Sequence, residues 1–158
     1  MRFIDRSAIA VFVACMMFAP ASHAQEGVIE RIDAQALRAL VTGLGHEITT
    51  ETVSETGQPV VAASNGQVNY VVAGTVCEEG QCQGMLSELV FTDTPVTLEV
   101  VNQVNQNYAA IKIVAMDDDH VVFSRYDVIN GGTTLGALST SVVTLLEVSS
   151  VIVRGNEE

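Results

Sequence analysis

Tryptophan is absent from this chain of 158 residues, and aromatic residues of all kinds make up only 5% of it. Proteins that hold sugars or unpaired bases largely stack them on aromatic side chains. The composition therefore argues against a site of that kind.

Basic residues are also scarce. Only 7 Lys and Arg stand against 19 Asp and Glu, which gives a net charge of −12 at pH 7. Nucleic acids and anionic membrane surfaces select basic patches, so neither is expected as a partner. The acidity favours solubility and cationic partners, although an acidic surface is often simply a solvated one.

The first 24 residues have the three parts of a cleavable signal peptide. Arg2 and Arg6 supply the positive start, residues 8–19 form an apolar segment too short to span a bilayer, and a small-x-small site ends at Ala24. Cleavage there predicts a periplasmic protein without stable membrane insertion. A lipoprotein would instead need acylation of Cys15, but the residues before it form a poor lipobox.

Two of the three cysteines, Cys77 and Cys82, lie outside the predicted signal peptide. An even pair in an exported protein predicts a disulfide, here closed over the turn-like residues 78–81. A redox motif usually has two intervening residues, and zinc would need ligands beyond His46 and His120. No metal or other cofactor is therefore expected.

The rest of the chain predicts one α+β domain over residues 33–154, between a flexible lead-in at 25–32 and an acidic tail at 155–158. Asp33 is placed to cap an amphipathic helix that runs to about Leu44. Four strands should follow, the first at a sheet edge and the third, apolar on both faces, near the centre. They are expected at about residues 46–53, 60–63, 68–76 and 83–91.

A second helix is predicted over residues 96–107, with Thr94 as its cap, Pro95 in its first turn and Leu98 on its apolar stripe. Two strands rich in β-branched residues should follow, separated by an acidic turn. An Asn-Gly-Gly corner breaks the second of these strands, and Thr133 or Thr134 can cap the last helix. The strands are expected at 110–116 and 121–129, and the last helix has its stripe at Leu135, Leu138, Val142, Leu145, Leu146, Ser149 and Ile152.

The run VNQVNQNY, a strand, the turn DDDH and then VVFSRYDVINGGTTLGAL together resemble the YbjN family, named as sensory transduction regulators. The family's Asn-x-Trp-Asn helix end is similar to Asn102 to Asn105, with Val104 in the place of the tryptophan. Its hydrophobic-x-Gly-Gly corner is similar to residues 127–132, and its exported members carry a Cys pair. The resemblance covers about residues 33–153. It implies a fold like that of type III secretion chaperones, an antiparallel sheet with helices, and it implies protein binding and dimerisation.

Asp117, Asp118, Asp119 and His120 form the densest group of potential ligands. Oxygen-rich turns bind Ca²⁺, but this run lacks the spaced Asp pattern and the later bidentate Glu of such sites. Consecutive strand residues also point to alternate faces, so the three carboxylates would not converge easily. A solvated hairpin is the favoured interpretation.

Asp127 could act as a general base beside Asn130, Gly131 and Gly132, but no nucleophile or His accompanies it in sequence. Such an Asp more often accepts backbone N–H groups in a turn or caps the next helix. Asn102 and Asn105 lie three apart on a helix and either bond the backbone of the next strand or form a polar patch for a partner.

The sequence therefore predicts a non-catalytic periplasmic interaction or regulatory domain, a sensor or chaperone-like protein. It should bind a protein partner and self-associate through a sheet edge or a helix face. The alternative is a small-ligand-binding protein or enzyme that uses Asp127 and the Asn130-Gly131-Gly132 corner, and a pocket that includes Asp127, His120 or Arg125 would support it.

Overall fold

The computed structural model describes residues 27–116 and 120–155, so the predicted signal peptide and the acidic turn at 117–119 lie outside the described residues. The elements follow in the predicted order of helix, four strands, helix, two strands and helix. They are α1 (Ala34–Gly43), β1 (Glu47–Val53), β2 (Pro59–Ser64), β3 (Asn69–Glu78), β4 (Gln81–Phe91), α2 (Leu98–Asn107), β5 (Lys112–Ala115), β6 (Val121–Val128) and α3 (Leu135–Gly155).

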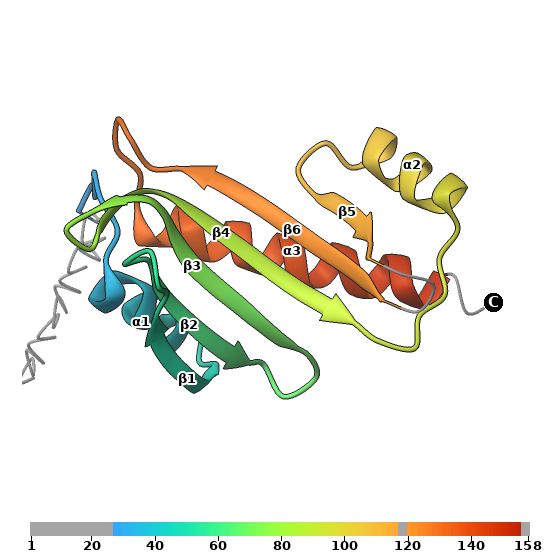
Figure 1. The fold of residues 1–158 in the computed structure, drawn as a ribbon, viewed down its shortest axis with the longest axis horizontal. Coiled ribbons are helices and arrows are strands. Elements are labelled where there is room, and N and C mark those ends of the chain that lie inside the picture. The colour runs from blue at the N-terminus through green and yellow to red at the C-terminus, as the bar shows by residue number, and fades with distance from the viewer. Residues whose placement is uncertain (1–26, 117–119, 156–158) are drawn as a thin grey trace, which may run out of the picture.

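The six strands form one antiparallel sheet in the order β1-β2-β3-β4-β6-β5. The predicted edge position of β1 and the interior position of β3 are both confirmed. Helix α1 packs on β1, β2 and β3, while α3 packs on β4 and β6 and also contacts α1. Figure 1 shows α3 running behind the sheet and α2 beside β5 at one end. Helices α1 and α3 therefore cover the same face of the sheet.

Alternation along the strands sets which side chains enter the core, because successive residues point to opposite faces. Tyr70 and Val72 of β3, and Phe123 of β6, are at most 2% exposed. The stripe predicted for α3 is confirmed from Leu138 onward, and Thr134 caps the helix by accepting the N–H of Ala137. Length and composition would also allow α3 to span a membrane, but here its apolar stripe packs on the sheet.

Helix α2 begins later than the sequence predicts. Thr97, not Thr94, is the cap, and its Oγ1 accepts the N–H of Val100 at 3.3 Å. Val101 and Val104 are buried as expected, but Leu98 is 75% exposed. Among the described elements, α2 packs mainly against the four-residue strand β5, and its first turn is left uncovered at Leu98.

The segment before α1 is not the flexible lead-in that the sequence predicts, at least over its described part. Ile32 is fully buried and exchanges two backbone hydrogen bonds with Cys82, of 2.8 and 3.0 Å. Ile29 pairs in the same way with Thr133, at 2.7 and 2.9 Å. Strand β6 pairs with β4 only as far as Gly84. Beyond that point, the backbone of Cys82 in β4 pairs with Ile32 of the N-terminal segment instead.

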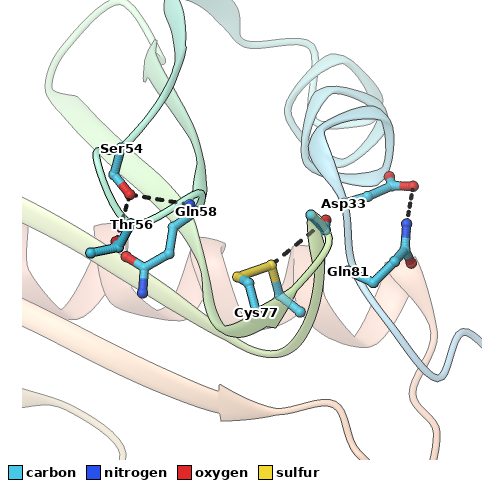
Figure 2. The surroundings of a disulfide bond; sticks show 8 residues. Asp33, Ser54, Thr56, Gln58, Cys77 and Gln81 are labelled. Atoms are coloured by element: carbon cyan, nitrogen blue, oxygen red, sulfur yellow. Dashed lines mark hydrogen bonds between the residues drawn. A yellow bond between two sulfur atoms is a disulfide. The ribbon is translucent and has the colours of Figure 1, made fainter.

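The predicted disulfide joins Cys77 and Cys82, which face each other across the β3–β4 hairpin. Glu79 and Gly80 form the turn, both with positive φ, as a tight hairpin requires. The side chain of Gln81 donates to Asp33 Oδ2 at 3.1 Å and so links the hairpin to the cap of α1 (Figure 2). The disulfide therefore lies where the hairpin, the N-terminal segment and α1 meet.

Removing this disulfide should lower the free energy of unfolding by about 2 kcal/mol, because a cross-link over so short a loop restricts the unfolded chain only modestly. The variant Cys77→Ala/Cys82→Ala and the reduced wild-type chain should both show this loss in urea denaturation. Reductant should leave the variant unchanged. Equal stability of oxidised and reduced wild-type protein would contradict a structural role for the bond.

Candidate interaction site

Asp127 lies on the side of β6 that faces α3, where it takes part in a partly buried polar joint. Ser141 donates from Oγ to Asp127 Oδ2 at 2.6 Å, and Arg125 donates from Nε to the same hydroxyl. Arg125 Nε also lies 3.5 Å from Asp127 Oδ1. Asp127 thus joins strand β6 to helix α3. The sequence had suggested instead that it caps the next helix or accepts backbone N–H groups in the corner. Ser141 is 4% exposed, so its hydroxyl is not accessible to a substrate.

The Asn130-Gly131-Gly132 corner receives the N-terminal segment. Gly131 and Gly132 both have φ of +100°, which glycine adopts at little cost. A Cβ on Gly132 would lie 2.7 Å from Cγ1 of Val28, so a larger residue would displace that segment. The N–H groups of Ile129 and Asn130 both bond the carbonyl of Gln83. The N-terminal segment therefore packs against Gly132, while Asn130 and Gly131 stay exposed and the Asp127 carboxylate is directed to α3.

Asn105 closes the outer edge of the sheet. Its Nδ2 donates to the carbonyl of Ile113 at 3.0 Å, and its Oδ1 accepts the N–H of Ile113 at 2.9 Å. These are the two bonds that a neighbouring strand would make, so the edge of β5 is occupied at this point. Of the two roles that the sequence allowed, Asn105 therefore has the first, bonding to the backbone of the next strand. Asn102 is exposed, and no hydrogen bond joins its side chain to any residue that the structure describes.

The face of the sheet opposite α1 and α3 has no helix over it among the described elements (Figure 1). Cross-strand partners share a face. Glu88 of β4 pairs with Val71 of β3 on one side and with Ser124 of β6 on the other. Leu86 of β4 pairs in the same way with Tyr126 of β6. We call this surface the open face and define it by Val71, Leu86, Glu88, Val90, Ser124, Tyr126 and Val128.

The open face is largely apolar and partly exposed. Val90, Tyr126 and Val128 are 53%, 51% and 68% exposed. The ring of Tyr126 lies across Gly84, where an added Cβ would be 2.3 Å from the tyrosine hydroxyl. Because Gly84 has no side chain, the aromatic ring can lie flat and fill the gap in the strand.

Two shallow hollows lie on either side of Glu88. One, of about 330 Å³, is lined by residues of β1 to β4 that include Val71 and Val90. The other, of about 460 Å³, extends to β5 and β6 and is lined by Lys112 and Tyr126 among others. Glu88 lines both, so it is the charged residue at the middle of the open face.

Sequence analysis did not single out Glu88, Leu86 or Tyr126. The signal was available in β4, where Met85 and Leu89 alternate with Leu86 and Val90, so that both faces of the strand are apolar. Two apolar faces are typical of a strand covered on both sides. Only the structure shows that one of these faces has no helix over it.

The shifted titratable groups are not arranged for acid–base catalysis. Burial raises the pKa of Tyr70 to about 12, and its hydroxyl lies 2.8 Å from Nδ1 of His46. The N–H of Ala36 lowers the pKa of Asp33, as expected for a helix cap. Within residues 27–116 and 120–155, no group of three His, Cys, Asp or Glu could hold a metal ion.

Replacing Asn105 by Ala should lower the free energy of unfolding by about 1–3 kcal/mol, because both backbone groups of Ile113 lose their partner. Asn102→Ala is the matched control on the same helix and should change the stability by less than about 0.5 kcal/mol. Urea denaturation of the two variants measures the difference. Equal losses would show that Asn105 does not seal the strand edge.

The fold is similar to that of a solved type III secretion chaperone from Yersinia pestis, SycH, crystallised in complex with a stable fragment of YscM2. The TM-score is 0.52 and the identity 15%, over 75% of this chain and 98% of the chaperone chain. This likeness confirms the α+β fold class. No curated protein matches the sequence.

The family model of YbjN, described as "Putative bacterial sensory transduction regulator", matches residues 33–151. The match covers α1, the whole sheet and most of α3, and it includes the Asn105 seal, the Asp127 joint and the Gly-Gly corner. The chain therefore belongs to the YbjN family.

Proposed function

We propose that this protein is a non-catalytic regulatory domain of the bacterial envelope that binds a protein partner on its open face. The observation that carries the proposal is the open face itself, because a sheet face with exposed Val90, Tyr126 and Val128 is typical of an interaction site. Membership of a family of regulators supports the regulatory part. The chaperone of similar fold was crystallised with a protein fragment, which supports a polypeptide as partner.

The polar residues that could have catalysed a reaction support the non-catalytic part. Asp127, Ser141 and Arg125 bond one another, and the N-terminal segment packs against Gly132 of the Asn-Gly-Gly corner. A small-ligand role remains the second candidate, since the larger hollow includes Arg125 together with Glu88 and Lys112. Its walls are shallow and open, which suits a polypeptide better than an enclosed small molecule.

Self-association is part of the proposal and would use the other edge of the sheet. Strand β1 is an edge strand with six exposed residues of seven, whereas Asn105 occupies the edge at β5. A second copy can add its own β1 in antiparallel pairing and leave both open faces free. Light scattering coupled to size exclusion should show a dimer with and without reductant. A monomer under both conditions would contradict this part of the proposal.

A photo-cross-linking residue placed at Val90 or Val128 should form adducts with a protein in intact cells. Val151 is the matched control, since it is 56% exposed but lies on α3, away from the open face. Mass spectrometry identifies the adducts. Adducts of equal yield at all three positions would show that the open face is not the binding site.

Export predicts that the chain recovered from cells begins at Gln25 and appears in the periplasmic fraction. Its intact mass should lack the two thiol hydrogens of Cys77 and Cys82. A chain that retains residues 1–24, or one acylated at Cys15, would contradict the periplasmic proposal.

A further inference from the structure

We infer that the partner segment on the open face carries a Lys or Arg that pairs with Glu88, with apolar residues two positions away on each side. This inference rests on the proposed function, because it specifies the chemistry of the segment that the open face binds. The partner is thus an extended, cationic polypeptide segment.

The position of Glu88 favours a cation in any occupant. Glu88 is half-buried as a residue and lies between Leu86 and Val90 along β4, and between Val71 and Ser124 across the sheet. A partner that covers the open face removes water from this carboxylate. An unpaired buried charge is strongly unfavourable, so a partner with only apolar side chains would bind poorly.

The chain does not neutralise Glu88 itself. Its cross-strand partners are Val71 and Ser124, and no ion pair joins it to Lys112 or to any other residue that the structure describes. Lys112 is the partner of Ser124 on the far side of β6 and therefore lies two strands away from Glu88. Arg38 and Arg125 are held by Glu51 and Asp127. Because no cation of the described chain forms an ion pair with Glu88, we assign the compensating cation to the partner.

The spacing of the segment follows from the strand beneath it. Leu86, Glu88 and Val90 are alternate residues of β4, so they line one face about 7 Å apart. An extended segment lying along β4 presents its own alternate residues at the same interval. An apolar-x-basic-x-apolar pattern therefore matches the apolar-acidic-apolar order of the open face.

The net charge of −12 agrees with this selection, because it attracts cationic segments and repels acidic ones at long range. Both edges of the sheet are less suited to such a segment. At the β5 edge, Asn105 occupies both backbone groups of Ile113. The exposed residues of β1 are mainly threonine and glutamate, without an apolar row.

Selection of phage-displayed random peptides on the purified oxidised chain tests the inference without knowledge of the natural partner. Enriched peptides should carry Lys or Arg with apolar residues two positions to either side. The variant Glu88→Lys should instead enrich Asp or Glu at the central position. Glu147→Lys, an equal charge change on an exposed residue of α3, should leave the wild-type pattern intact.

Titration of a synthetic wild-type-selected peptide gives the quantitative readout. Glu88→Gln should weaken its binding at least about tenfold, as expected when one member of a desolvated ion pair loses its charge. Circular dichroism and thermal melting of each variant establish that the fold is retained. Equal affinity for wild type and Glu88→Gln would overturn the inference.

The failure of this inference can be separated from failure of the proposed function. One result would be that wild type selects apolar peptides without a basic residue, whose binding the variant Val90→Asp abolishes. That result would overturn the Glu88 pairing and leave the open face as the binding site. If Val90→Asp leaves peptide binding unchanged, or if no peptide is enriched at all, both the Glu88 pairing and the open face as binding site are overturned. Light scattering could also show a dimer that the variant Glu88→Lys dissociates. A second copy of this chain would then be the occupant of the open face, and the inference of a cationic partner segment would be overturned.

Discussion

The apolar stripe of α3 packs across β4 and β6, and together with α1 it closes one face of the sheet. This one-sided packing determines which face of the sheet is buried and which is left uncovered. The strands that α3 covers carry apolar residues on both sides, so the face away from α3 remains apolar and exposed at Val90 and Tyr126. Burial of such surface is the main favourable term in protein association. The same packing that stabilises the fold therefore leaves a surface for a partner.

Two groups of polar side chains join elements of the fold. Asn105 substitutes for a missing strand at β5, and Ser141 bridges Arg125 and Asp127 between β6 and α3. Pairing of such groups stabilises the fold, because a buried polar group without a partner costs about 1–3 kcal/mol. Glu88 differs from them because its carboxylate has no partner in the described chain. For that reason it is the residue through which a partner can be selected.

Much of the fold was predictable from local patterns. The element order, the Asp33 cap and the stripe of α3 follow from spacing and capping preferences within a few residues, and the disulfide follows from an even cysteine pair in a chain with a signal-peptide pattern. The errors arose where distant segments meet. Ile32 looked like part of a flexible lead-in, but it pairs with Cys82, fifty residues away. Leu98 fitted the stripe of its helix, yet β5 is too short to cover it.

The sequence by itself determined an acidic α+β domain with a short disulfide and a signal-peptide pattern, because these depend on composition and on local spacing. The tertiary structure decided which apolar strand face is covered and which polar side chains are paired. Leu86 and Met85 are neighbours of similar character, yet Met85 is fully buried and Leu86 belongs to the open face. Alternation shows that they point in opposite directions, but only the placement of α1 and α3 shows which direction leads to solvent.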